Sequence, residues 1–84
     1  MKRIRLTRHA REQCQERGAT EAEVRHCIAH GAREPARMGR ELCRFNFPFA
    51  REWQGNAYAI KQVAPVIEET ATEIVVITVY TFYF

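Results

Sequence analysis

The chain has 84 residues, of which 46% are hydrophobic and 27% are charged, and its formal net charge is +3. This length corresponds to a single domain, residues 1–84, and the composition is that of a globular rather than a disordered protein. The sequence contains no serine and no aspartate. A Ser-His-Asp hydrolase is therefore excluded, and a two-metal nuclease is disfavoured because such sites usually draw on several acidic ligands.

The positive charge is concentrated in the first part of the chain. Twelve of the thirteen basic residues lie at or before Arg51, and all of these except Lys2 are arginines. Guanidinium groups match phosphate geometry, so this region favours an anionic partner such as RNA. The alternative is a solvated surface whose arginines pair with neighbouring glutamates. The candidate nucleic-acid contacts are Arg3, Arg5, Arg8, Arg11 and Arg44.

Cysteine usage and hydropathy indicate a cytoplasmic protein. Cys14, Cys27 and Cys43 lack the CxxC spacing of zinc or redox sites, so we expect reduced thiols. No apolar run is long enough to span a bilayer, and the basic N-terminal residues are not followed by an apolar segment. We therefore expect no secretory signal and no membrane partner.

Two helices are predicted in the N-terminal part of the chain. Residues 1–6 alternate loosely and suggest a short edge strand or an extended arm. Thr7 is a typical N-cap for a helix that ends at Gly18. Residues 20–23 (Thr-Glu-Ala-Glu) form a capping box and begin a second helix, with an apolar stripe that ends at Gly31.

The remainder of the chain is predicted to form strands. Residues 33–39 contain Pro35 and Gly39 and are expected to be irregular. We predict a strand over residues 41–47 that Pro48 ends, a turn over 51–56, and a strand over 57–63 that continues past Pro65 only as an edge. Residues 73–84 are predicted to form the longest strand. Its first residues are apolar on both faces, so we expect it to be central in the sheet. The predicted fold class is α+β, with two N-terminal helices packed on one face of a three- to four-stranded antiparallel sheet.

Two residues of the first helix are candidates for chemistry. His9 lies at the edge of the packed stripe among arginines, where it could transfer a proton near neutral pH. The alternative is a solvent-exposed surface histidine. Arg17 ends the helix on the buried-side stripe, so it either serves a site or complements the helix dipole.

Further candidates lie on the strands. Thr78 and Tyr80 continue the face of Ile74 and Val76, and together they could contact a phosphate oxygen and a base. Ordinary β-propensity also explains both residues. Lys61 is expected on a half-exposed sheet face, where it could stabilise an anionic transition state or simply protect an edge.

Two other features leave alternatives open. His26 and His30 are spaced as HxxxH around Cys27, but neither the glutamate of HExxH nor a third ligand follows, so we predict no metal site and no cofactor. The aromatic C-terminal end, residues 80–84, could close the core, stack on bases or form a homodimer contact.

Three segments resemble a family of small bacterial and phage proteins that is known only as a domain of unknown function. They are residues 6–10 (LTRHA), residues 16–20 (ERGAT) with Glu23 and Val24, and residues 76–80 (VITVY). The family pattern is a T-x-H-A helix start, an R-G-[I/A]-[ST]-x-x-E-V second helix and a closing V-x-T-V-Y strand. This chain departs from it at Ala19, where a larger aliphatic is more usual, and in its aromatic rather than basic tail.

This family is grouped by fold with the barnase, EndoU, colicin and RelE-type (BECR) ribonucleases, of which the last are toxins of toxin–antitoxin pairs. The resemblance implies a curved sheet that holds RNA on its face, metal-independent cleavage, and an antitoxin protein as a partner. Carried onto the matching positions, it implies catalytic roles for His9, Arg17, Thr78 and Tyr80. Lys61 and Arg44 are added from their sheet positions alone.

Three functions follow as hypotheses, of which the third is a metal-binding domain that uses His26, Cys27 and His30. The first is a metal-independent endoribonuclease, in which His9 transfers a proton while Arg17 and Lys61 offset charge on the transition state. It requires His9, Thr78 and Tyr80 to share one cleft. The second is a non-catalytic module that binds nucleic acid or another protein.

Overall fold

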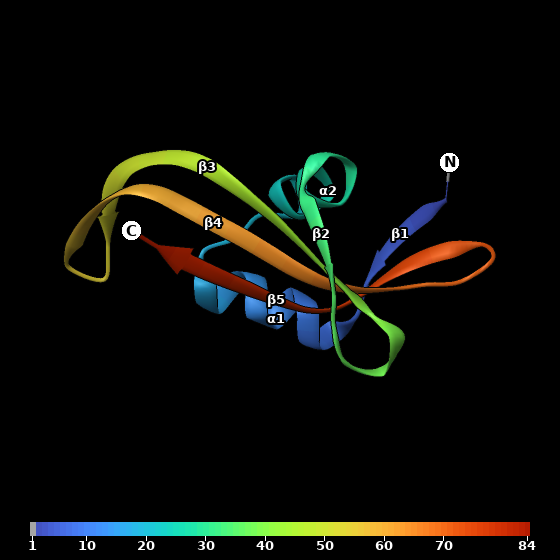
Figure 1. Cartoon of the computed structure of the whole chain (residues 1–84). Helices are drawn as coiled ribbons and strands as arrows, with labels where there is room; N and C mark the ends of the chain where they lie inside the picture. Colours follow the sequence, from blue (N-terminus) through green and yellow to red (C-terminus); the bar gives the residue numbers. More distant parts are fainter. Residues whose placement is uncertain (1) are drawn as a thin grey trace.

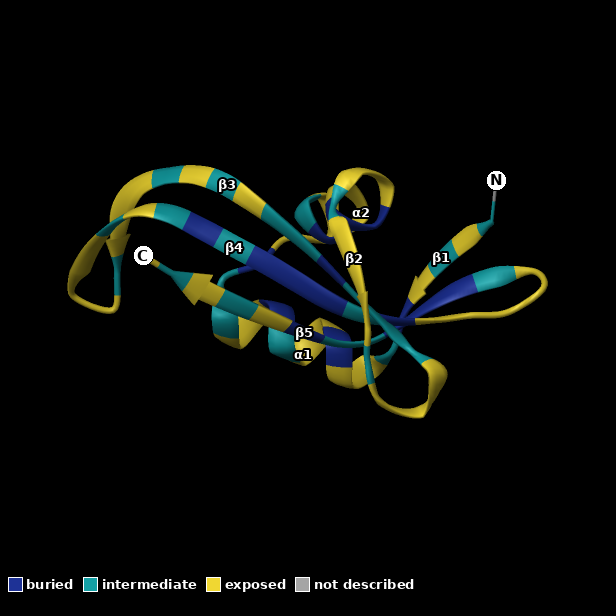
Figure 2. Cartoon of the chain, viewed as in Figure 1, coloured by how far each residue is buried: buried dark blue, intermediate teal, exposed yellow. Residues whose placement is uncertain are grey.

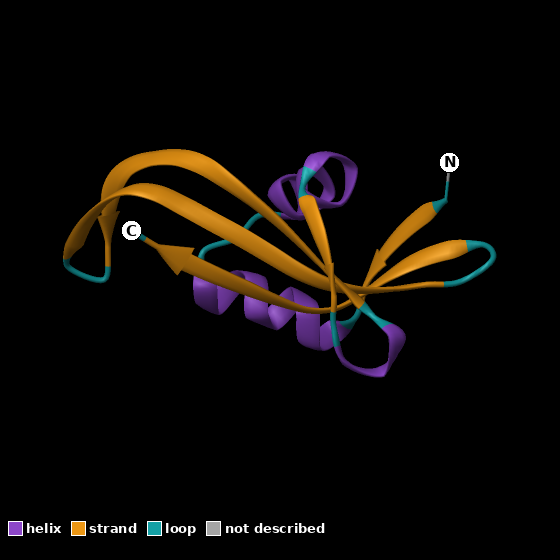
Figure 3. Cartoon of the chain, viewed as in Figure 1, coloured by secondary structure: helices purple, strands orange, loops and turns teal. Residues whose placement is uncertain are grey.

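The computed structural model describes residues 2–84, which form two helices and a five-stranded sheet (Figures 1 and 3). In chain order the elements are β1 (Arg3–Leu6), α1 (Arg8–Arg17), α2 (Glu21–His30), β2 (Ala32–Pro35), a 3-10 turn η1 (Arg37–Gly39), β3 (Glu41–Trp53), β4 (Asn56–Glu69) and β5 (Glu73–Tyr83). The α+β class with two N-terminal helices is confirmed. Neither helix of the described chain has the length and hydropathy needed to cross a membrane.

The sheet is mixed, with the strand order β1-β5-β4-β3-β2. The pairs β2–β3, β3–β4 and β4–β5 are antiparallel, whereas β1 lies parallel to β5 with Leu6 opposite Val76. The prediction of three to four antiparallel strands is therefore wrong in strand number and in the direction of β1. The expected N-terminal strand forms over Arg3–Leu6, and Met1 lies outside the described residues.

Both helices begin and end where the sequence predicts. The Thr7 hydroxyl accepts a hydrogen bond from the Ala10 N–H, and Gly18 ends α1 in the left-handed conformation with φ 76°. Thr20 and Glu23 form the reciprocal capping box of α2, which ends at Gly31. These bonds satisfy backbone groups that a helix end leaves without intrahelical partners.

The core lies between the helices and one face of the sheet, hereafter the helix face. Helix α1 packs along β5, and α2 packs against β3 and β4 (Figure 1). The middle of β4 and the start of β5 are the most buried parts of the sheet (Figure 2). Val24, Cys27, Cys43, Val63 and Val76 have no exposed surface, so each contributes about 1–2 kcal/mol of burial energy. The other face, hereafter the open face, is covered by neither α1 nor α2 (Figure 1).

Pro48 and Pro65 both lie inside long strands, whereas Pro48 was predicted to end its strand and Pro65 to allow only an edge continuation. β3 passes through Pro48 to Trp53, and β4 passes through Pro65 at the centre of the sheet. The β3–β4 register shifts directly after Pro48, and the β4–β5 register shifts directly after Val66, the neighbour of Pro65. Proline lacks an N–H for the ladder and is tolerated beside such irregularities.

Two predicted loops are also corrected. The segment expected to be irregular, residues 33–39, contains β2, which pairs with the start of β3 as a hairpin with Pro35 opposite Glu41. The expected turn over residues 51–56 is reduced to Gln54 and Gly55, since Trp53 already pairs with Asn56. The sheet consequently gains β2, and β3 and β4 extend beyond the predicted strands over residues 41–47 and 57–63.

A bulge in β5 changes which face its side chains occupy. Val66 pairs with Thr78 and Ile67 pairs with Val76, so Ile77 has no opposite residue on β4. Val76 and Val79 therefore both lie in the core, while Thr78 and Tyr80 lie on the open face. The expectation that Thr78 and Tyr80 continue the face of Val76 is wrong, because one extra residue reverses the alternation.

Candidate functional site

The candidate site lies where α1 begins, beside the bulge of β5. The Thr7 N–H donates to the Val76 carbonyl at 3.1 Å, and β1 pairs with β5 only as far as Val76. Beyond that point β5 is an edge strand within the described chain. A side chain at the start of α1 can therefore reach around this edge to the open face.

His9 makes this connection. Its Nε2 lies 3.3 Å from Thr78 Oγ1, which is within hydrogen-bond distance. His9 is exposed and Thr78 is half-buried, so a substrate oxygen beside the threonine hydroxyl would come within reach of the imidazole. The bulge matters here, because without it Thr78 would face the core.

Arg17 meets the same edge one strand step further on. Its Nη1 donates to the Val79 carbonyl at 3.0 Å, and its guanidinium carbon lies 5.2 Å from the centroid of the Tyr80 ring. Its own carbonyl accepts hydrogen bonds from Thr81 at 3.0 Å and Tyr83 at 2.6 Å. Arg17 thus anchors the helix end to β5 while its charge lies at the Tyr80 ring.

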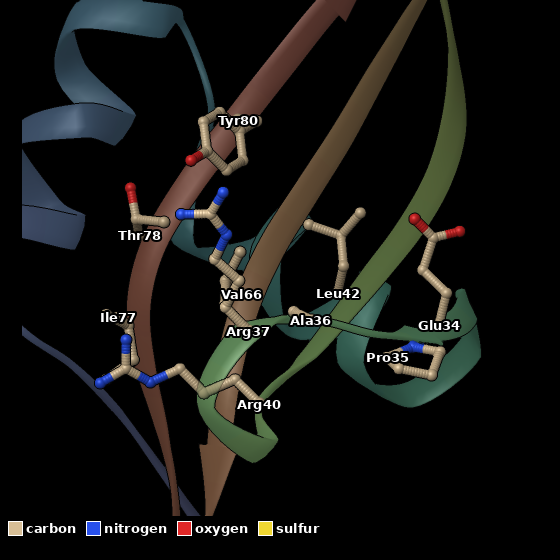
Figure 4. Close-up of a pocket in the computed structure, with 10 residues that line it drawn as sticks. All are labelled: Glu34, Pro35, Ala36, Arg37, Arg40, Leu42, Val66, Ile77, Thr78 and Tyr80. Carbon is tan, nitrogen blue, oxygen red and sulfur yellow. The ribbon is translucent and has the colours of Figure 1, made fainter.

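A pocket of about 370 Å³ adjoins these residues on the open face. The β2–β3 hairpin forms one side, and the bulged part of β5 with Thr78 and Tyr80 forms the other (Figure 4). Arg37 and Arg40 extend from the hairpin toward β5 in this view. Sequence reasoning missed both arginines, although a hairpin reading of Pro35 and Gly39 would have placed them at a turn.

The requirement that His9, Thr78 and Tyr80 share one cleft is met only in part. Thr78 and Tyr80 line the pocket, whereas His9 contacts Thr78 from the edge of β5 without lining it. Lys61 lies elsewhere. It is only 4% exposed, on the helix face, so the expectation of a half-exposed position is wrong. Its Nζ donates to the Gly18 carbonyl at 2.8 Å and lies 2.9 Å from each carboxylate oxygen of Glu23. Its alternation with Val63 places it under the helices, away from Thr78 and Tyr80.

Most of the candidate nucleic-acid arginines have acidic partners. Arg5 pairs with Glu73, and this hydrogen bond lowers the pKa of Glu73 below its ordinary value. Arg11 pairs with Glu21. The remaining pairs are Arg8 with Glu12 at 3.9 Å and Arg44 with Glu34 at 3.0 Å. Among residues 2–84, Arg3 alone of the five has no carboxylate within 4.0 Å.

Arg44 differs from the N-terminal arginines because it lies on the open face. Besides Glu34, its guanidinium donates to Gln62 at 2.9 Å and lies 5.8 Å from the centre of the Phe82 ring. The side chains of Arg44 and Tyr80 therefore belong to the same surface of the sheet. Arg3, Arg5, Arg8 and Arg11 do not line this pocket.

The two histidines of the HxxxH segment in α2 pack against each other and against a neighbouring aromatic ring. The His26 ring lies edge-on to Phe45 at 4.4 Å between centroids and 4.7 Å from His30. The Cys27 thiol points to the Val63 carbonyl, and burial raises its pKa to about 12. In the described part of the chain no three His, Cys or Glu side chains are grouped to hold a metal ion.

Comparison with known protein families, curated proteins and solved structures found no match to this chain.

Proposed function

We propose that the protein is a metal-independent ribonuclease of the BECR type, acting on RNA bound across the open face. The observation that carries the proposal is the 3.3 Å approach of His9 Nε2 to Thr78 Oγ1 at an arginine-rich surface. A histidine is the usual general base near neutral pH, and an arginine suits a phosphate. The resemblance of residues 6–10 and 76–80 to the ribonuclease-related family agrees with it.

In this proposal His9 accepts the proton of the ribose 2′-hydroxyl. The 2′ oxygen then bonds to phosphorus and the bond from phosphorus to the 5′ oxygen breaks, which leaves a 2′,3′-cyclic phosphate. The departing oxygen takes a proton from water, and the histidinium returns its proton to solvent, so the charges balance. Thr78 orients the phosphate, Arg17 offsets the charge on it, and Tyr80 supports a base. Lys61 has no part in these steps.

A second candidate function is a non-catalytic module that binds nucleic acid or protein, including an antitoxin or a second copy of the chain. Tyr80, Phe82 and Phe84 are 41%, 44% and 56% exposed, and exposed aromatic side chains of this kind serve both stacking and protein contacts. The pairing of Arg5, Arg8 and Arg11 with carboxylates also weakens the N-terminal region as a phosphate-binding surface.

The ribonuclease mechanism requires the 2′-hydroxyl of RNA, whereas a binding module cleaves neither RNA nor DNA. Comparing RNA with DNA therefore distinguishes the two functions. End-labelled RNA and a DNA strand of the same sequence are incubated with the protein, free in the presence of a chelator and, separately and without chelator, in a translating lysate. We expect cuts in the RNA only, leaving cyclic phosphate ends. Equal cutting of both strands would contradict the mechanism, and absence of cutting under all conditions would favour the binding module.

A further inference from the structure

The open-face pocket contains two arginines whose donors are little used. Within residues 2–84, no carboxylate lies within 4.0 Å of the Arg37 guanidinium, and no hydrogen bond to it is formed. Arg40 Nε is 3.8 Å from Glu68 Oε1, too far for a hydrogen bond, and is buried with no other partner in the described chain. By contrast, Arg5, Arg11 and Arg44 each donate to a glutamate.

Arg40 has only the 3.8 Å ion pair with Glu68, and its buried Nε forms no hydrogen bond within residues 2–84, so a bound anion would satisfy donors that Arg37 and Arg40 leave unused. The only carboxylate among the pocket residues is Glu34, and Arg44 already binds it at 3.0 Å. The Thr78 hydroxyl and the Tyr80 ring form the facing wall (Figure 4). The pocket therefore combines two positive charges, a hydroxyl and an aromatic surface.

The hairpin holds both arginines in place. The Ala36 N–H donates to the Arg40 carbonyl at 2.8 Å, and the Arg40 N–H donates to the Arg37 carbonyl at 3.2 Å. Met38, between them, has a left-handed φ of 61° and is 81% exposed. The backbone thus turns the methionine outward, and a pre-formed loop reduces the entropy lost when a ligand binds.

We propose that Arg37 and Arg40 bind a phosphate group of single-stranded RNA next to the scissile one, with its base against Tyr80. This proposal rests on the proposed function for the position of the cleaved phosphate, but the binding itself needs no chemistry. Arginine forks match phosphate oxygens, and bases stack on exposed aromatic rings regardless of sequence. A duplex cannot present an unstacked base to Tyr80, so the site selects unpaired RNA.

The test uses a fluorescent single-stranded RNA in which every 2′-hydroxyl is methylated, so that it can be bound but not cleaved. Its affinity is measured by anisotropy for wild type, the double variant Arg37→Gln/Arg40→Gln, and the control Arg25→Gln, which removes one exposed charge from α2 on the other side of the sheet. We expect the double variant to lose affinity by about tenfold or more and the control to lose little. The dependence of affinity on salt is also expected to become shallower only in the double variant.

A second measurement keeps the inference separate from the proposed function. The double variant Arg37→Lys/Arg40→Lys retains both charges, so most of the salt dependence is expected to return. Equal affinities of the Gln/Gln variant and the Arg25→Gln control, with circular dichroism showing both folded, would overturn the inference. If the methylated RNA binds as expected but natural RNA is never cut, the ribonuclease proposal fails and the phosphate site stands.

Discussion

Lys61, which is buried, and Glu23, which is half-buried, form an ion pair that joins the centre of the sheet to the start of α2. The lysine Nζ lies 2.9 Å from each carboxylate oxygen, and Glu23 Oε1 also accepts the Thr20 N–H at 2.9 Å in the capping box. Because the same ammonium donates to the Gly18 carbonyl, one side chain connects β4 with the ends of both helices. We therefore assign Lys61 a structural role.

This role predicts that the two partners differ when replaced. Glu23→Gln leaves a buried ammonium without its carboxylate and is expected to destabilise the fold by about 2–4 kcal/mol. Lys61→Met removes the charge and keeps most of the packing, so its effect is expected to be smaller, about 1–2 kcal/mol. Urea unfolding of both variants checks this. A Lys61→Met variant that is as stable as wild type but loses RNA cleavage would show that the lysine serves the reaction instead.

The contact at Gly18 predicts a severe effect of a single methyl group. Gly18 has φ 76°, and a Cβ there would lie 2.7 Å from the Tyr83 hydroxyl and 2.8 Å from the Trp53 ring. Gly18→Ala is therefore expected to lower the free energy of unfolding by about 2 kcal/mol or more, from backbone strain together with the clash. Gly55→Ala is the control, since it also has a positive φ of 86° but open space around it. Equal losses for the two variants would attribute the effect to the backbone alone.

The helices were predictable from sequence because their signals are local. Thr7 and the Thr20–Glu23 box fix the starts, and Gly18 and Gly31 fix the ends, through groups within a few residues of each other. The strands depend on partners far along the chain. Pro65 suggests an edge by local rules, yet it lies in the central strand beside a register shift that only the pairing with β5 creates.

The site was predictable in part for the same reason. His9, Arg17, Thr78 and Tyr80 were identified from motifs, and the structure brings them to one edge of β5. The bulge at Ile77, which turns Thr78 and Tyr80 to the open face, was not predicted, because an apolar run in the sequence does not indicate a bulge. Arg37 and Arg40 were missed since their segment was taken as irregular, whereas the hairpin folds them over β5. Lys61 was misplaced because sequence alternation does not tell which face is covered.

The buried thiol of Cys27 predicts a loss of stability in alkali. Burial raises its folded-state pKa to about 12, whereas in the unfolded chain a thiol ionises near its ordinary value, about 8.5–9. The stability is therefore fully present below pH about 9 and is lost as the pH rises toward 12, by about 1.4 kcal/mol for each pH unit. Unfolding measurements from pH 8 to 11 on wild type and Cys27→Ala check this. If the stability difference between the two proteins is constant with pH, the thiol does not ionise on unfolding.

Two replacements of Thr78 test the role of its hydroxyl separately from the shape of its side chain. Thr78→Val keeps the β-branched form on the half-buried strand and removes the hydroxyl that meets His9 Nε2. We expect the rate of cleavage to fall by about tenfold or more, because one hydrogen bond at the site is lost. Thermal stability is expected to change little. Thr78→Ser should recover most of the rate. A Val variant that is fully active would remove Thr78 from the site.

His9 is the residue on which the ribonuclease account depends most directly. The measurement is single-turnover cleavage of labelled RNA by wild type and His9→Ala, with His30→Ala as the control because it removes an exposed histidine from α2. We predict that His9→Ala slows cleavage by about 10²–10⁴-fold, as expected for a general base, while His30→Ala cleaves like wild type. Cleavage by His9→Ala at the wild-type rate, with the protein folded, would contradict the account.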